Sequence, residues 1–282
     1  MAFSFECYAV THIGNQRKNN EDNFYIGEII SSEEQSSMSQ TKIKSISKNI
    51  VATGTMNRVF AVSDGMGGHE FGEVASYIVA NALGEFSIEQ SAKLCCRKKE
   101  KFAYIQAFQE MIDQANLKIN EFAINKDVAE NMGATLSGII IFSDEVVPFN
   151  IGDSTTFVYE KKTLRKLTTD DNEMTMFDGA ASQKFEANGK RLTKYFGLPK
   201  SSGVLTATIT KPAPLKLGQI YMIASDGLTD SLSHNKVSRI IGECTGSIET
   251  AANNLLREAL SSKNGGHDNI TIVMIKTTKT TK

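Results

Sequence analysis

The sequence has few of the residues that bind zinc or form disulfides. It contains four cysteines without a Cys-x-x-Cys pair and four histidines without a His-Glu-x-x-His motif, so neither a zinc site nor a disulfide framework is indicated. It also lacks an apolar run approaching the roughly 18 residues that a membrane-crossing helix needs. The N-terminal residues show no basic segment followed by an apolar stretch, which argues against a signal peptide. These absences predict a reduced, soluble, cytoplasmic protein.

An excess of either charge is absent as well. Lysine and arginine together number 31, aspartate and glutamate 32, and the formal net charge is −1. A nucleic-acid binder usually has a basic excess, and a charged tail usually shows in such totals, so both classes are disfavoured. With 282 residues, 40% of them hydrophobic, the chain can bury a full core, and a single α/β or α+β domain of this size is common.

Apolar residues at helical spacing predict three long helices. The pattern covers residues 71–83, 102–122 and 248–260, where apolar side chains recur three and four positions apart. Gly84 is expected to end the first of these helices. A shorter helix is expected at Asn235–Gly242.

Short runs rich in β-branched and aromatic residues predict strands. They are Val59–Ser63, Thr135–Phe142, Glu145–Ile151, Thr155–Glu160, Gln219–Ser225 and Ile270–Ile275. Several are joined by tight turns, which favours antiparallel pairing. Because the strands cluster in mid-chain and the helices come in blocks, the pattern indicates the α+β class.

Two stretches show little periodicity. Residues 31–57 are rich in serine, lysine and glutamate, and residues 170–200 are rich in aspartate, asparagine and glycine. We expect the first to be a surface insertion and the second to be a flap. No internal repeat or inter-domain linker is found, so residues 1–282 are expected to form a single domain.

The most informative polar residues are acids at the ends of predicted strands. They are Glu21, Asp22, Asp64, Asp153, Asp226, Asp230 and Asp268. The end of one antiparallel strand and the start of its neighbour share a rim, so these carboxylates are expected to converge. Close carboxylates need protons or cations, and oxygen ligands alone favour magnesium, manganese or calcium. Alternatively, each Asp-Gly pair only forms a turn. Turn formation is a sufficient explanation for any single pair, but a weaker one for the whole set.

The glycine-rich stretch from Asp64 to His69 matches neither of two common nucleotide-binding motifs. A G-x-G-x-x-G motif would need glycine at position 70, which is Glu70, and the Gly-Lys-Ser/Thr of a P-loop is absent. Both nucleotide interpretations fail. What remains is a turn in which the Gly65 carbonyl can approach a ligand without obstruction by a side chain.

A series of short motifs resembles, in order along the chain, the metal-dependent Ser/Thr protein phosphatases of type 2C in their bacterial form. The motifs are Arg17-x-x-Asn20-Glu21-Asp22, Asp64-Gly65-Met66-Gly67-Gly68-His69, Gly133-Ala134-Thr135, Gly152-Asp153-Ser154, Leu167-Thr168-x-Asp170, Ser225-Asp226-Gly227-Leu228-x-Asp230 and Gly265-Gly266-x-Asp268-Asn269-x-Thr271. The resemblance runs from residue 11 to residue 276, nearly the whole chain. The resemblance implies a four-layer αββα sandwich, in which two central antiparallel β-sheets are flanked by helices.

The resemblance also implies a centre with two tightly bound Mn²⁺ or Mg²⁺ ions. Asp64 matches the residue that bridges the two ions. Asp226 and Asp268 match the other protein ligands of the first ion, and Glu21 and the Gly65 carbonyl match those of the second.

Further matches concern a third, weaker ion and the substrate. Asp153 and Asp226 match the positions that hold this third ion in bacterial relatives, with Asp230 beside it. Asp22 matches a residue that orders bound water, and Arg17 matches the residue that grips the substrate phosphate. The planar fork of Arg17 suits phosphate oxygens.

The activity implied by the resemblance is hydrolysis of phosphoserine and phosphothreonine on proteins, by attack of a hydroxide that bridges the two metal ions. Two cations lower the pKa of a bridging water and screen the phosphate, so no covalent intermediate is needed. We expect Arg17, Asp64 and Asp226 to be essential. The expected partners are phosphorylated proteins, including a Ser/Thr kinase or its substrates, with no nucleic acid and no membrane, and the expected form is a monomer.

Several positions depart from the family pattern. Met66 replaces a histidine that some members use to protonate the leaving alkoxide, so water bound to a metal ion would have to do so here. Thr155 stands where the family has arginine, and Asp171-Asn172 where it has His-Ser. These changes spare the metal ligands. They leave two alternatives open, a catalytically silent phosphoprotein-binding member of the fold and a hydrolase of small phosphoesters.

Overall fold

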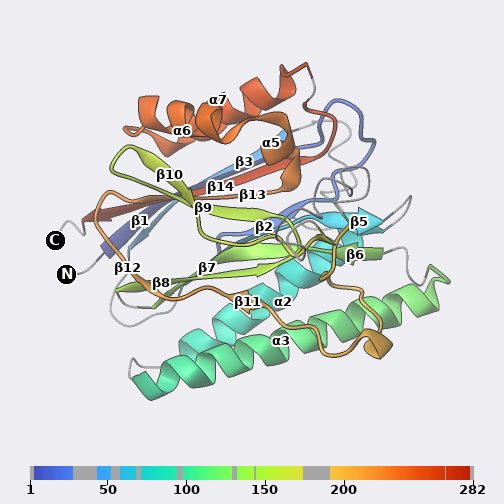
Figure 1. Cartoon of the computed structure of the whole chain (residues 1–282). Helices are drawn as coiled ribbons and strands as arrows, with labels where there is room; N and C mark the ends of the chain where they lie inside the picture. The colour runs from blue at the N-terminus through green and yellow to red at the C-terminus, as the bar shows by residue number, and fades with distance from the viewer. Residues whose placement is uncertain are drawn as a thin grey trace, which may run out of the picture.

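Two antiparallel β-sheets lie face to face between two layers of helices (Figure 1). The computed structural model describes residues 3–27, 43–51, 58–67, 71–93, 98–128, 132–142, 144–173, 191–263 and 265–279. The four-layer αββα sandwich implied by the motifs is confirmed, and so is the α+β class.

The first sheet contains strands from both ends of the chain. Its order is β10-β9-β13-β14-β1-β3. The bounds are β1 Phe3–His12, β3 Ile43–Val51, β9 Thr155–Glu160, β10 Thr163–Lys166, β13 Ile220–Ala224 and β14 Ile270–Lys279. β1 pairs with β14 along its whole length, with Cys7 opposite Ile275. The first and last described strands are therefore neighbours within this sheet.

The second sheet has the order β11-β8-β7-β4-β2, and β12 also pairs with β8. The bounds are β2 Asn23–Tyr25, β4 Arg58–Ser63, β7 Leu136–Phe142, β8 Glu145–Ile151, β11 Thr208–Ile209 and β12 Ala213–Pro214. A separate short pair, β5 Gly65–Gly67 and β6 Met132–Ala134, lies beyond the ends of β4 and β7.

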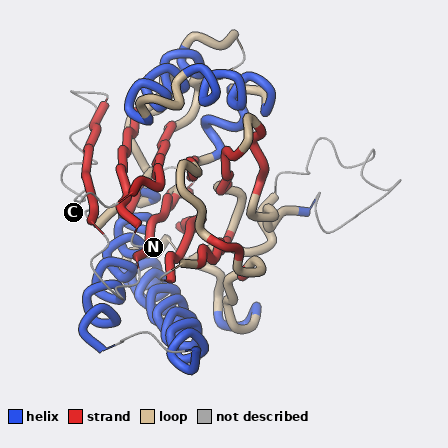
Figure 2. Tube along the Cα trace, turned by 90° about the vertical axis from the view of Figure 1, so that its left-hand side faces the viewer, coloured by secondary structure: helices blue, strands red, loops and turns tan. Residues whose placement is uncertain are grey.

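Helices cover the outer face of each sheet (Figure 2). The helices α2 Gly72–Lys93 and α3 Lys98–Asn125 pack on the second sheet, and α5 Asp226–Ser231, α6 His234–Glu243 and α7 Ile248–Leu260 pack on the first. Within the described ranges, no helix has the length and apolar character required to cross a membrane.

Burial on both faces explains the continuous apolar runs of the central strands. In β14, Val273 and Ile275 face the other sheet, while Ile272 and Met274 face the helices. A strand enclosed on both sides needs apolar residues at successive positions. The rigid sandwich that results fixes where the strand ends lie.

The helices predicted from apolar spacing are all present, but one predicted boundary is wrong. Gly84 does not end the first helix, because α2 continues to Lys93. The buried Leu83 and Phe86 extend the packing of this helix on the second sheet, and such tertiary packing overrides the weak helix preference of glycine. Phe102, assigned to the apolar stripe of α3, is 77% exposed.

The expected surface insertion at 31–57 is partly integrated into the sandwich. Residues 43–51 form β3, which pairs with β1 at the edge of the first sheet, and Ile46 packs against the core between the sheets. The rest of this stretch lies outside the described residues. Residues 174–190 of the expected flap also lie outside the described residues, and backbone hydrogen bonds join residues 171–173 to residues 191–193.

Candidate functional site

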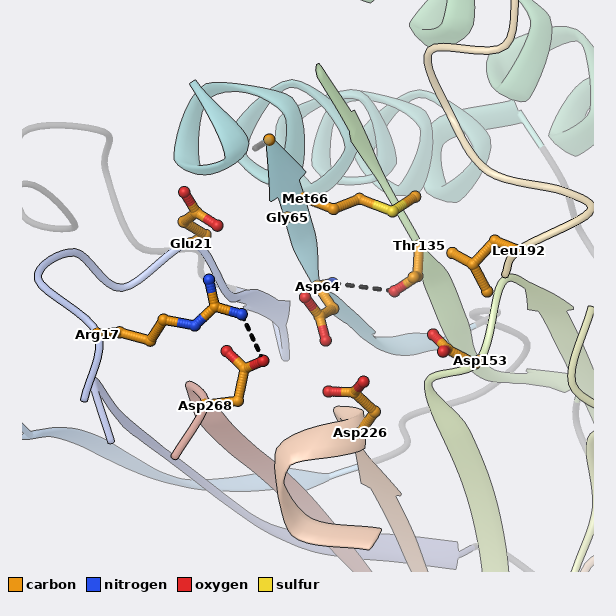
Figure 3. A pocket seen from close by; sticks show the side chains of 11 residues that line it. Arg17, Glu21, Asp64, Gly65, Met66, Thr135, Asp153, Leu192, Asp226 and Asp268 are labelled. Atoms are coloured by element: carbon orange, nitrogen blue, oxygen red, sulfur yellow. Dashed lines mark hydrogen bonds and ion pairs between the residues drawn. The ribbon is translucent and has the colours of Figure 1, made fainter. Parts of the chain in front are cut away.

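The predicted metal ligands and Arg17 line one pocket at the ends of the strands (Figure 3). The pocket has a volume of about 320 Å³, and its charged residues are Arg17, Glu21, Asp64, Asp153, Asp226 and Asp268. Gly65 lines it too. The convergence expected from strand-end positions is therefore confirmed for this set.

Four of the five pocket acids lie at the end of a strand, while Glu21 lies in the loop between β1 and β2. Asp64 directly follows β4, and Asp153 lies in the turn between β8 and β9. Asp226 follows β13 closely and is the first residue of α5, while Asp268 comes just before β14. Two sheets therefore supply the carboxylates, and the packing between the sheets sets their spacing.

Asp64 is anchored by Thr135, a residue to which the sequence assigned no task. The Asp64 N–H donates to Thr135 Oγ1 at 3.0 Å, and the Thr135 N–H donates to the Asp64 carbonyl at 2.8 Å. The same hydroxyl lies 2.7 Å from Ser154 Oγ. Thr135 thus links the backbone of Asp64 to the turn that carries Asp153.

Gly65 lies where no side chain fits. Its N–H donates to the Glu21 carbonyl at 3.1 Å, and a Cβ there would lie 2.1 Å from the Gly72 carbonyl oxygen and 2.4 Å from that of Glu21. The Glu21 carboxylate lies against Gly72 at the start of α2. Glycine at 65 and 72 therefore lets the loop of Glu21 approach the start of α2 and the pocket.

Arg17 forms an ion pair with Asp268, with Nη2 2.6 Å from Oδ2 (Figure 3). Their side chains are 50% and 38% exposed. The hydrogen bond from its guanidinium to Asp268 raises the pKa of Arg17. Arg17, the residue expected to bind phosphate, is thus paired with Asp268, a residue expected to bind metal. While this ion pair is formed, Arg17 is not free to bind phosphate and Asp268 is not free to bind metal.

The remaining carboxylates of the pocket lie half-buried among like charges. Burial, together with the nearby charges of Asp153 and Asp268, raises the pKa of Asp226 to about 8. Burial, with Asp22 and Asp226 nearby, raises the pKa of Asp64 well above its usual value. Burial likewise raises the pKa of Glu21 to about 7. Such groups bind protons or cations near neutral pH.

The donor set fits a hard divalent cation. All the acidic side chains of the pocket offer oxygen atoms, which suit Mg²⁺ or Mn²⁺. In the described part of the chain, no three acidic, histidine or cysteine side chains are already arranged to hold an ion. Binding would therefore draw the carboxylates inward and displace their protons.

Two predicted supporting residues lie outside the pocket lining. Asp22 is buried, and its Oδ2 accepts a 2.7 Å hydrogen bond from Ser225 Oγ, next to Asp226. Burial raises the pKa of Asp22 to about 6. Asp230 is exposed on α5, and its charge adds to the raised pKa of Asp226. Their expected roles remain predictions.

Leu192 and Met66 also line the pocket, and neither was assigned a contact with substrate. Figure 3 shows the Leu192 side chain near Thr135 and Asp153. Leu192 falls within the aperiodic stretch 170–200, where the sequence carries no signal that would place a side chain.

Comparisons with known proteins agree on one family. The Listeria welshimeri serine/threonine phosphatase stp is 28% identical over 223 residues, covering 77% of this chain and 84% of that protein. The Mycobacterium tuberculosis serine/threonine protein phosphatase PstP is 27% identical over 77% of this chain and 40% of that protein.

Solved structures share the fold. The S. agalactiae serine/threonine phosphatase matches with a TM-score of 0.74 at 21% identity, covering 96% of this chain and 99% of that one. The crystal structure of M. tuberculosis PstP matches with a TM-score of 0.72 at 21% identity, over 98% and 100%. Residues 49–262 match the family model described as protein phosphatase 2C. The chain therefore belongs to the protein phosphatase 2C family.

Proposed function

We infer that the protein is a metal-dependent protein phosphatase that hydrolyses phosphoserine and phosphothreonine on proteins. One observation carries this inference, namely that every acid expected to ligate metal lines the same pocket as Arg17, in a chain of the protein phosphatase 2C family. A structurally similar PstP catalytic domain, at a TM-score of 0.70 and 22% identity, is described in complex with two manganese ions.

The residues present suit two divalent cations, with a third beside them. We propose that Asp64 would be a ligand of both ions, Asp226 and Asp268 would be the other protein ligands of the first ion, and Glu21 with the Gly65 carbonyl would hold the second. Asp153 and Asp226 would hold the third. Bound Mn²⁺ or Mg²⁺ supplies positive charge that lowers the pKa of coordinated water and screens the phosphate.

We propose that Arg17, which lines this pocket, receives the substrate phosphate. Its guanidinium offers a rigid fork that matches two phosphate oxygens. Since Asp268 now holds that fork at 2.6 Å, a cation that takes over Asp268 would free Arg17 for the phosphate. Met66 has no proton to give, so the leaving alkoxide would take its proton from water.

The test is phosphate release from a phosphothreonine peptide by chelator-treated protein, with and without Mn²⁺. We expect release only with Mn²⁺, and none from Asp64→Asn. Release from p-nitrophenyl phosphate but not from the peptide would instead identify a small-phosphoester hydrolase. Peptide binding without release from either substrate would identify a silent member of the fold.

We also propose phosphorylated proteins, including a Ser/Thr kinase or its substrates, as the physiological partners. The names of the curated relatives support phosphoprotein substrates. A cytoplasmic location and a monomeric state remain predictions. Light scattering after size-exclusion chromatography tests the monomer, since a mass near twice 30.9 kDa would contradict it.

A further inference from the structure

We propose that Asp171 and Lys194 act as a pair of positioning residues that hold the Gly152–Asp153 turn, and thereby set the affinity of the cation site to which Asp153 contributes. This inference rests on the proposed function, since it concerns one of the cation sites proposed above. It also assigns a role to Asp171, a position where the sequence departs from the family pattern.

The backbone of the turn is constrained at Gly152. This residue has φ +97°, a left-handed conformation that favours glycine. A Cβ there would lie 2.6 Å from Thr135 Cγ2. The turn therefore sits tightly against Thr135, and its remaining freedom depends on the groups that bind its peptide units.

Asp171 binds Gly152 on both sides. The Asp171 N–H donates to the Gly152 carbonyl at 2.8 Å, and the Gly152 N–H donates to Asp171 Oδ2 at 3.2 Å. Asn150 Nδ2 donates to the same carbonyl at 2.7 Å. Since Asp153 directly follows Gly152, these bonds fix the start of its backbone.

Lys194 holds the other carboxylate oxygen of Asp171. Its Nζ lies 3.2 Å from Asp171 Oδ1, and it also donates to Thr208 Oγ1 at 3.0 Å. The Asp171 side chain is only 11% exposed and that of Lys194 is 37% exposed. Thr208 Oγ1 donates to Asp171 Oδ1 as well, at the longer distance of 3.4 Å. Removing Lys194 would leave the charge of Asp171 with this neutral donor in place of the ammonium, so Lys194 is expected to help keep Asp171 in place.

Backbone hydrogen bonds beside this pair also join the two described ends of the 170–200 stretch. The Thr193 N–H donates to the Asp171 carbonyl at 2.8 Å, and the Glu173 N–H donates to the Arg191 carbonyl at 3.0 Å. Leu192, between these bonds, lines the pocket. One unit therefore holds both the turn of Asp153 and an apolar part of the pocket wall.

A neighbouring ion pair provides a matched control. Lys166 Nζ contacts both oxygens of Asp170 at 2.7 Å, and Thr155 Oγ1 donates to Asp170 Oδ1 at 3.3 Å. This pair lies beside the same turn, but the bonds to Gly152 come from Asp171. Lys166→Met therefore removes a lysine–aspartate contact without removing a bond to Gly152.

The test is calorimetric titration of the chelator-treated full chain with Mn²⁺, resolving the weakest site from the tighter ones. We expect Asp171→Ala and Lys194→Met to weaken the Mn²⁺ affinity of that site about 10-fold. This is the lower end of the loss in affinity that is typical when a residue orienting a metal ligand is removed. The tighter sites should be unchanged, as should every site in Lys166→Met. Asp171→Asn, which keeps an acceptor for the Gly152 N–H, should recover part of the loss.

The outcomes separate this inference from the proposed function. If Asp153→Asn removes the weakest site while Asp171→Ala and Lys194→Met leave it intact, the positioning role is wrong and the site assignment stands. If the weakest site is insensitive to Asp153→Asn, both are overturned. Lys194 is partly exposed, so Lys194→Met should fold, and its thermal unfolding curve checks that it does.

Discussion

The two sides of the acidic pocket are neutralised in different ways. On one side, Asp268 is partly exposed and pairs with Arg17 at 2.6 Å. On the other, Asp64 and Asp226 are half-buried, and the strongest influences on the pKa of each are loss of solvation and neighbouring carboxylates. The protein supplies its own cation to the first side, whereas the second side is built to receive protons or a cation from solution.

The net charge of the chain does not reveal this difference between the two sides of the pocket. The chain as a whole has a formal charge of −1, yet the pocket holds a local excess of acids. Close carboxylates in a sheltered site cannot all ionise without cations. A bound divalent ion therefore changes both the chemistry of the site and the stability of the fold.

The largest effect should come from removing an acid on the side of Asp64 and Asp226. Asp64→Asn and Asp226→Asn are expected to lower Mn²⁺-dependent phosphate release by more than about 100-fold. Loss of a residue that only supports a metal ligand costs up to about 100-fold, and loss of a ligand itself should cost more. Glu243→Gln, an exposed acid on α6 that does not line the pocket, serves as the control and should change little. Wild-type rates in both pocket variants would contradict the assignment of the site.

A smaller effect is expected on the Arg17 side. Arg17→Ala should raise KM for a phosphopeptide about 10-fold, the loss expected for a charged hydrogen bond, and should lower kcat less. Arg17→Lys should recover only part, because an ammonium lacks the planar fork. Steady-state kinetics measures both constants, and an unchanged KM would remove Arg17 from the phosphate site.

The smallest predicted effect is a pH dependence of stability. The pKa of Asp226 in the fold, about 8, lies above its usual 3.8, so its stabilising contribution is present at low pH and lost as pH rises toward 8. Chelated protein should lose a few degrees of Tm between pH 5 and 8, since about 1 kcal/mol shifts Tm by about 2–4 °C at this size. Saturating Mn²⁺ should reduce this loss. A flat or rising profile without metal, measured by thermal unfolding, would contradict the account.

Much of the fold was predictable because packing follows local pattern. The helix at Ile248–Leu260 coincides with its predicted range, as do the strands Glu145–Ile151 and Thr155–Glu160. Strand β3 was not predicted, since residues 43–51 lie within a serine- and lysine-rich stretch and show no strict alternation, their apolar residues falling at positions 43, 46, 50 and 51. Its pairing with β1 is a long-range contact that local composition does not encode.

The acids of the site were predictable for a different reason. Asp64, Asp153 and Asp226 each mark the end of a buried strand, and such ends share a rim in an antiparallel sheet. The Arg17–Asp268 pair was not predictable, because 251 positions separate the two residues. Nor was the contact of Asp171 with Gly152, which depends on how an aperiodic segment returns to the turn.

The most direct test of the difference between the two sides is thermal unfolding of wild type and Asp226→Asn at pH 8, each measured with chelator and with saturating Mn²⁺. The account predicts that the order reverses. Without metal, Asp226→Asn should unfold at the higher temperature because it removes a half-buried like charge, and with Mn²⁺ the wild type should be higher because it binds the ion. A wild type that is more stable under chelation, or that gains nothing from Mn²⁺, would contradict the claim that the side of Asp64 and Asp226 is built for a cation.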